Sequence, residues 1–180
     1  LPTDFRTVGG VTAAPTEETV WAIREAQQLQ RFISELAQDD DEIVPVADIP
    51  HKSIHDNAEI VALEQREQFQ VPLEQQLKWP TQETFARWRL KMQARGIFVL
   101  VKRMPREDCR GFSLTGDGLV STLVVNAVDV ETAKTFTLFH EYAHLMLRNA
   151  GVCVRGEDYT DRGLVERWSN QFAAAFLIPA

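Results

Sequence analysis

The stretch Thr135-Phe-Thr-Leu-Phe-His-Glu-Tyr-Ala-His-Leu145 carries the strongest structural signal in the chain. It places His140 and His144 four residues apart, with Glu141 directly after the first histidine. In an α-helix, residues four apart lie one turn apart on the same face. Two imidazoles placed in this way can bind one Zn²⁺ and leave other coordination positions open. The stretch therefore predicts a helix with a metal-binding face.

Glu141 is expected to act beside the metal rather than on it. It lies about 100° around the helix from His140, and its longer side chain can reach a water on the metal. The metal would lower the pKa of that water toward ~7 and polarise a peptide carbonyl. Glu141 would then take the proton and pass it to the leaving amine. The alternative is a pair of surface histidines beside a solvated glutamate, but the flanking Phe136, Leu138 and Phe139 favour a site on a packed helix.

A catalytic zinc site takes a third protein ligand and keeps a fourth position open. Glu166 is favoured because a helix can fix its position by packing, although it could also be an exposed carboxylate paired with Arg162. Asn170, four residues later, could hydrogen-bond a histidine ligand. Cys153 is the main rival, but an ordinary buried cysteine is the preferred interpretation of that residue. The downstream candidates are Cys153, Glu157, Asp158, Asp161 and Glu166.

The elements around this motif predict an α+β fold. Short apolar runs bounded by turn residues predict three strands, and the last two are joined through a turn at Gly116–Gly118. Apolar spacing and capping residues predict the helices. The expected strands are Ile97–Val101, Gly111–Leu114 and Thr122–Asn126, and the expected helices are 16–37, 57–69, 81–95, 132–148 and 163–177.

The domain interpretation is a single unit over residues 1–180. Residues 1–95 form a mainly helical lead-in, and residues 96–180 carry the sheet and the metal-binding helices. Because the chain begins with Leu1, we expect it to be a piece of a longer protein. The first helix is expected to have an apolar face made of Trp21, Ile23, Leu29, Phe32, Ile33 and Leu36. The tryptophans at 21, 79, 88 and 168 are expected in the protein core.

The composition excludes several classes of function. The net charge of -7 argues against direct nucleic-acid binding, whose footprint is basic. No apolar run approaches the ~20 residues of a membrane-spanning helix. Two cysteines do not form a disulfide framework, so a reduced cytoplasmic setting is expected.

Several motifs in a fixed order resemble the ImmA/IrrE family of metallo-endopeptidases. The resemblance covers roughly residues 80–179 and is strongest from residue 111 onward. The motifs are Gly111-Phe-Ser-Leu114, Leu123-Val-Val-Asn126, Thr135–Leu145 with its His-Glu-x-x-His core, Gly151-Val-Cys153, and Glu166-x-x-x-Asn170-x-Phe172-Ala-Ala.

The resemblance implies a minimal zincin-like fold in which a small sheet lies over two metal-binding helices. It implies that Glu166 is the third ligand beside His140 and His144, with Zn²⁺ as the cofactor and Mn²⁺ as another fitting cation. It also implies cleavage of a helix-turn-helix transcriptional repressor in a stress or mobile-element response. The chain departs from the usual pattern at Ser169, where Ala is common, and it stops at Ala180, where family members usually continue.

Two further interpretations remain open from the sequence. A non-cleaving regulatory or sensor module could keep the fold and the metal, but such a module has no need of Glu141. A structural zinc protein is disfavoured because structural sites are usually closed and cysteine-rich. For an active enzyme, we expect strand Thr122–Asn126 to form the sheet edge that pairs with an extended substrate.

Three other residues or pairs are assigned structural roles. His51 and His55 are expected in a surface loop rather than a second metal site, because they follow Pro50 and lack the glutamate. Tyr142 is expected to pack on the far side of its helix. Tyr159 is expected to be a plain loop residue.

Overall fold

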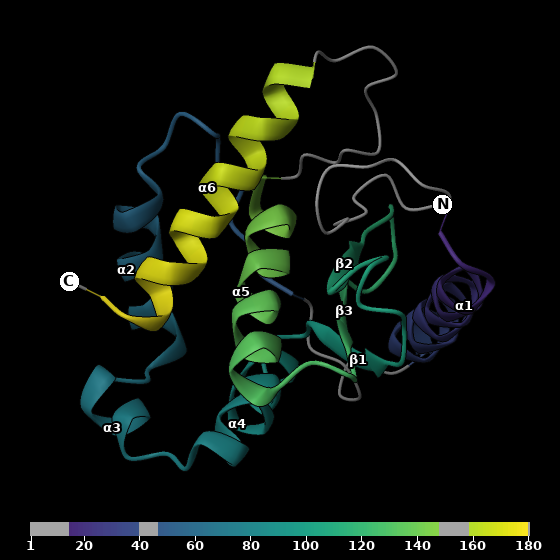
Figure 1. The fold of residues 1–180 in the computed structure, drawn as a ribbon, viewed down its shortest axis with the longest axis horizontal. Helices are drawn as coiled ribbons and strands as arrows, with labels where there is room; N and C mark the ends of the chain where they lie inside the picture. Colours follow the sequence, from purple (N-terminus) through teal and green to yellow (C-terminus); the bar gives the residue numbers. More distant parts are fainter. Residues whose placement is uncertain (1–14, 40–46, 148–158, 180) are drawn as a thin grey trace.

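The structure is a computed structural model that describes residues 15–39, 47–147 and 159–179. This described part contains six helices and a three-stranded sheet, which confirms the predicted α+β class (Figure 1). No helix within these ranges has the length and apolar character needed to cross a membrane. The elements are α1 (Glu17–Asp39), α2 (Ala58–Phe69), α3 (Leu73–Leu77), α4 (Thr81–Gln93), β1 (Phe98–Lys102), β2 (Gly111–Leu114), β3 (Thr122–Asn126), α5 (Glu131–Leu147) and α6 (Tyr159–Leu177).

Most boundaries agree with the expected ones, and the differences have local causes. Strands β2 and β3 have the predicted bounds, and β1 is shifted by one residue. Asn57 caps α2, because its side-chain oxygen accepts from the backbone N–H groups of Glu59 and Ile60. The short helix α3 was not predicted, since five residues after Pro72 carry too little periodicity to register. Helix α6 begins at Tyr159, four residues before the predicted Gly163.

The sheet order is β1-β3-β2, and this order corrects the expectation for β3. β3 pairs in parallel with β1 and antiparallel with β2, so it lies in the middle of the sheet. All five of its residues are buried. The backbone N–H and C=O groups of a strand that is paired on both sides are already used in the sheet, so a peptide cannot pair with that strand. The prediction that Thr122–Asn126 forms the sheet edge was therefore wrong; β1 and β2 are the two outer strands of the described sheet.

Side chains alternate across the sheet and supply two cores. On one face, Val99, Leu123 and Val125 pack with the interior formed by α2, α4, α5 and α6. On the other face, Leu100 and Val124 pack with residues of α1. This alternation follows from the two-residue period of a strand. The described part is thus layered, with α1 on one side of the sheet and α5 on the other (Figure 1).

Helix α1 turns to the sheet a face that only partly matches the predicted one: Ile23 is buried, and Leu29 packs against the same core. Its buried apolar residues are Ala22, Ile23 and Ala26, whereas Trp21 and Phe32 are 66% and 56% exposed. Small residues allow the helix to approach the sheet closely. The large aromatic residues therefore point away, and their assignment to the core was wrong.

Candidate metal centre

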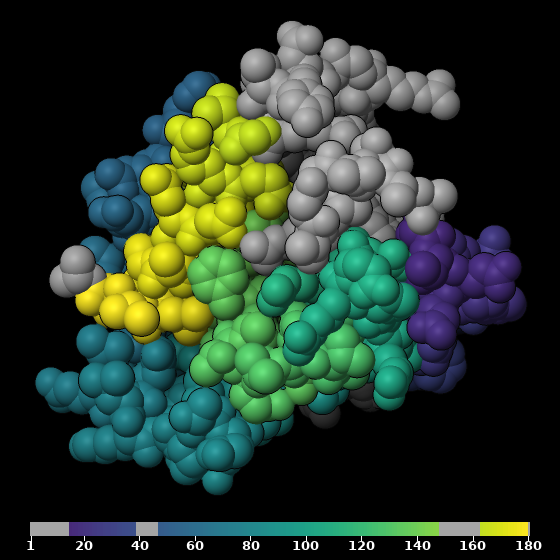
Figure 2. All heavy atoms as spheres, viewed as in Figure 1, coloured from purple at the N-terminus to yellow at the C-terminus, as the bar shows by residue number. Residues whose placement is uncertain are grey.

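Helix α5 separates the two parts of the site. It packs against α6 on one side and against β2 and β3 on the other. On the face drawn in Figure 2, α6 in yellow, α5 in green and sheet residues in teal lie side by side. His140 and His144 face α6, where they approach Glu166. Glu141, one residue further along the helix, lies close to β2. Helical geometry therefore sorts the metal ligands and the candidate base onto different sides of α5.

Packing and capping hold α6 in place beside α5. Phe139 of α5 stacks on Phe176 of α6, with ring centroids 4.0 Å apart. Near the other end, the Trp168 indole N–H donates to a backbone carbonyl before α2 at 2.8 Å. Arg66 of α2 donates to the Phe176 carbonyl at 2.6 Å, and its positive charge lies at the negative end of the helix dipole. These contacts set the position at which α6 presents Glu166.

The three candidate ligands converge as a zinc site requires. The Nε2 atoms of His140 and His144 are 3.0 Å apart, and each lies 3.4 Å from a carboxylate oxygen of Glu166. Tetrahedral zinc with bonds of 2.0–2.1 Å separates its ligand atoms by about 3.3 Å. Within the described residues, this is the one group of three or more potential ligand side chains that gathers in this way. The donor set of two imidazoles and a carboxylate therefore fits zinc, with a coordination position left open.

Asn170 orients the first histidine. Its side-chain oxygen lies 3.1 Å from Nδ1 of His140. An amide oxygen can only accept a hydrogen bond, so Nδ1 of His140 carries the proton. The other ring nitrogen, Nε2, is the atom that faces His144 and Glu166. This contact confirms the predicted place of Asn170 beside a histidine of the site.

The histidines favour the charged form of Glu166. Burial raises the pKa of Glu166, but hydrogen bonds from His140 and His144 outweigh burial and hold this pKa well below its ordinary value. The carboxylate is 39% exposed, so the site also opens toward solvent on this side. A charged carboxylate is the form that binds a cation. The local electrostatics thus agree with the ligand geometry.

Glu141 lies against the start of the outer strand β2. Its residue exposure is 1%. A Cβ atom built on Gly111 would lie 3.4 Å from Cγ of Glu141, so the strand backbone runs directly past the glutamate. This proximity of Gly111 was not predicted. The signal available in the sequence was a glycine at the first position of a strand, a position where a close approach of two backbones is common.

The remaining candidates are either outside the described residues or apart from the site. Cys153, Glu157 and Asp158 lie outside the described residues, as do the side chains of Tyr159, Asp161 and Arg162. His51 and His55 are exposed and join no ligand group within the described part of the chain, as expected. Tyr142 is fully buried and donates to the Gln65 side chain at 2.7 Å, which confirms its packing role.

Cys109 is buried near the site but is not suited to bind metal. Burial, together with the charges of Glu141 and Asp108, raises the pKa of Cys109 to about 12. Its thiol lies 3.6 Å from the sulfur of Met104. A thiol that remains protonated at neutral pH is a poor metal ligand and a poor nucleophile. Cys109 is therefore a core residue behind Glu141.

Comparison with known proteins adds one finding. Residues 92–180 match the model of the peptidase M78 family, described as the IrrE N-terminal-like domain. The match includes the end of α4, the whole sheet, α5 and α6. No curated protein and no solved structure matches the chain.

Proposed function

Residues 92–180 belong to the peptidase M78 family, described as IrrE N-terminal-like, and from this membership we propose that the chain is a zinc-dependent endopeptidase. His140, His144 and Glu166 would hold the metal, and Glu141 would act as the general base. Bound zinc would supply a Lewis acid and lower the pKa of a water molecule. The observation that carries the proposal is the convergence of two Nε2 atoms and a carboxylate within tetrahedral spacing.

Glu141 is suited to proton transfer by its surroundings. Its side chain extends from α5 toward Gly111 of β2, and the substrate would lie on this side. As the general base, it would take a proton from the attacking water and deliver it to the nitrogen of the departing peptide. Its near-complete burial limits competition from bulk water.

Strand β2 supplies the edge for substrate. The Asn126 N–H donates to the Arg110 carbonyl at 2.8 Å, so residue 110 faces β3. In an antiparallel pair the backbone direction alternates, so the N–H and C=O groups of Gly111 and Ser113 point away from β3. An extended peptide can pair with such groups as an added strand. Because Gly111 lies beside Glu141, where an added Cβ would come within 3.4 Å of its Cγ, the scissile bond of that peptide would lie close to the base.

The proposed substrate is a helix-turn-helix transcriptional repressor that controls a stress or mobile-element response. The chain would cleave this repressor in the cytoplasm. Strand addition reads backbone more than side chains, so the cleaved segment would be a flexible linker or one that unfolds locally. The net charge of -7 favours recognition of the repressor itself rather than its DNA.

The decisive test compares Glu141→Gln with Glu83→Gln, an exposed glutamate on α4. Both variants and the parent chain are loaded with zinc, their metal content is measured by mass spectrometry, and each is incubated with the repressor encoded beside its gene. We expect the parent and Glu83→Gln to cleave at one site. Glu141→Gln should keep one zinc per chain and lose cleavage, because an amide cannot accept the proton.

Two outcomes would count against the proposal. Loss of zinc from Glu141→Gln would show that this residue is a ligand and not the base. A parent chain that binds zinc and the repressor without cutting it would instead favour the regulatory module that keeps metal and fold.

A further inference from the structure

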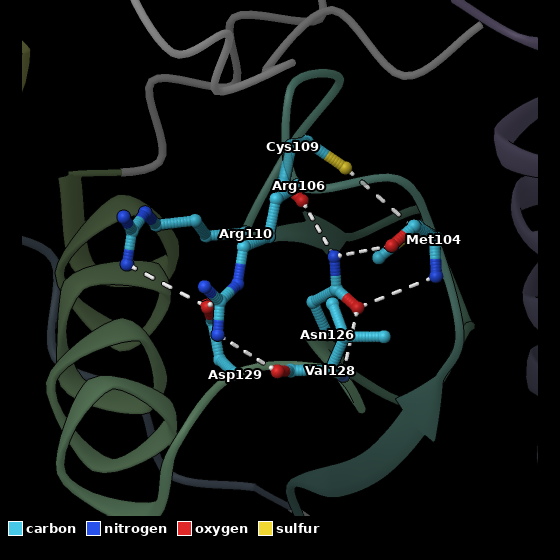
Figure 3. Close-up of polar contacts among 7 residues, drawn as sticks. All are labelled: Met104, Arg106, Cys109, Arg110, Asn126, Val128 and Asp129. Atoms are coloured by element: carbon cyan, nitrogen blue, oxygen red, sulfur yellow. Dashed lines mark hydrogen bonds and ion pairs between the residues drawn. The ribbon is translucent and has the colours of Figure 1, made fainter.

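Two arginines share one buried carboxylate at the end of the sheet nearest the start of α5. The Asp129 side chain is 1% exposed, and its Oδ1 lies 3.0 Å from Nε of Arg106 and 3.7 Å from Nη1 of Arg110. Figure 3 shows both guanidinium groups on the same side of Asn126. Two positive charges and one negative charge leave this cluster with a net charge of +1.

Asn126 fixes the loop that carries these arginines. Its side-chain amide nitrogen donates to the carbonyls of Met104 and Cys109, both at 2.9 Å. Its side-chain oxygen accepts from the backbone N–H groups of Met104 at 3.3 Å and Val128 at 3.2 Å (Figure 3). One buried side chain thus ties the β1–β2 loop to the turn before α5. This loop positions the two arginines before any ligand binds, which reduces the conformational entropy lost on binding.

Both guanidinium groups keep donors for a ligand. Arg106 uses Nε for Asp129 and Nη2 for the Val128 carbonyl at 2.9 Å, and a guanidinium has five N–H donors. Its side chain is 53% exposed, and that of Arg110 is 38% exposed. Val130, the residue after Asp129, is 62% exposed, so apolar area adjoins the positive charge. A carboxylate is the group that a guanidinium fork matches best.

The local charge contrasts with that of the rest of the protein. Lys102 at the end of β1 pairs with Glu25 of α1, so the positive charge argued for here is the net charge of +1 of the arginine cluster, in a chain of net charge -7. The carboxylate of Asp108, in the same loop, contacts the start of α1, where it accepts hydrogen bonds from Thr16 and Thr19. An acidic side chain is therefore attracted to this cluster, although the chain as a whole is acidic.

We propose that Arg106 and Arg110 bind an acidic side chain of the substrate close to the scissile bond. The proposal rests on the proposed peptidase function and names the substrate feature that the enzyme would select. Arg110 directly precedes Gly111, where the outer strand passes beside Glu141. Because an extended peptide advances ~3.3 Å per residue along the strand, the acidic residue would lie at one fixed position relative to the cleaved bond.

The test uses the zinc-loaded full chain and a library of peptides prepared from a digested proteome. Cleaved peptides are sequenced by mass spectrometry for the parent, Arg110→Gln and Arg87→Gln. Arg110→Gln removes the net positive charge but leaves the closer Arg106–Asp129 pair in place, so the loop should stay folded. Arg87 on α4 is a matched control, because its side chain is 45% exposed and it also pairs with one carboxylate, that of Glu83.

We expect Asp or Glu to be enriched at one fixed position in peptides cleaved by the parent and by Arg87→Gln. In Arg110→Gln this enrichment should fall roughly three- to tenfold, while preferences at other positions persist. Arg110→Lys should recover part of it, because charge returns without the planar fork. Equal acidic enrichment in the parent and Arg110→Gln, or none in the parent, would overturn the proposal.

A second readout separates this proposal from the peptidase function. If no variant cleaves any peptide, the proposed function fails, and the zinc-loaded Glu141→Gln chain is then immobilised with and without Arg110→Gln and exposed to the same library. Retention of acidic peptides that depends on Arg110 would support the binding site. Retention that is absent, or independent of Arg110, would refute it.

Discussion

Gly111→Ala tests how closely the outer strand lies against the helix that carries Glu141. A Cβ atom at this position would lie 2.5 Å from Cγ2 of Thr137, 2.7 Å from the Val124 carbonyl oxygen and 3.4 Å from Cγ of Glu141. Two of these separations are far below a carbon contact of about 3.5–4.0 Å. The threonine methyl group can move, but the Val124 oxygen belongs to the backbone of the central strand. The strand β2 must therefore shift away from α5.

The expected cost follows from this overlap. One extra methyl group in a packed interior costs about 1–3 kcal/mol. For a chain of this size, each kcal/mol lowers the melting temperature by about 2–4 °C, so the fall should be about 2–12 °C. Zinc content should not change, because the ligands face α6 rather than β2. Cleavage should fall, because the substrate edge has moved relative to Glu141.

The free energy of unfolding and the melting temperature of the zinc-loaded protein are measured by denaturant and thermal unfolding, and cleavage is measured on the same samples. Gly163→Ala in α6 is the control, since a Cβ there meets nothing within 4 Å. That variant should gain up to about 1 kcal/mol from helix propensity. Thr137→Ser in the Gly111→Ala background should restore part of the loss by removing one of the two close contacts. A Gly111→Ala protein with parental stability and parental cleavage would refute the placement of β2.

Three further predictions concern the ligands, the sheet and acid stability. Asn170→Ala should lower zinc affinity by roughly 10–100-fold, measured by competition with a chromophoric chelator, and unchanged affinity would argue against its orienting role. Val124→Pro should prevent folding, because β3 is the central strand, and circular dichroism would show the loss of structure. Ser113→Pro, on the outer strand, should leave the fold and the bound zinc intact but weaken cleavage. The opposite pattern in the two variants would contradict the strand order. Burial raises the pKa of Asp108, but the hydrogen bonds from threonines at the start of α1 together lower it by more, so the net shift of this pKa is downward. Its contribution to stability should therefore be present above about pH 4 and lost as the pH falls below that value; Asp108→Asn should remove this acid-dependent part of the unfolding free energy.

The metal-binding residues could be predicted because their signals are local. The spacing of His140 and His144 depends only on helix geometry. Asn170 could be paired with a histidine for the same reason, since it shares a helix face with Glu166. The third ligand was harder to choose, because the distance between two helices depends on how they pack. Sequence spacing alone left Cys153 open beside Glu166, and the family resemblance favoured Glu166.

The order of the strands could not be read from their sequence order. Val124 and its neighbours form a continuous apolar run, which is typical of a strand buried on both faces and is hard to reconcile with an edge. The short connection from this strand to α5 suggested an edge instead, but a short connection does not determine which neighbours a strand has. The prediction that Trp21 lies in the core was wrong for a related reason. The buried face of α1 contains Ala22, Ile23 and Ala26, and side-chain size alone does not reveal this.

The hydrogen bond from Arg66 to the end of α6 affects which fragment of the protein can fold on its own. The family match begins at residue 92, yet Arg66 and Gln76, which cap the carbonyls of Phe176 and Leu177, come before it. Phe69, also before the match, packs edge-on against the Phe176 ring. Expression of residues 92–180 alone would expose this interior and release the end of the helix that carries Glu166. The smallest piece that keeps the metal ligands in register should therefore start at or before Asn57, which caps α2.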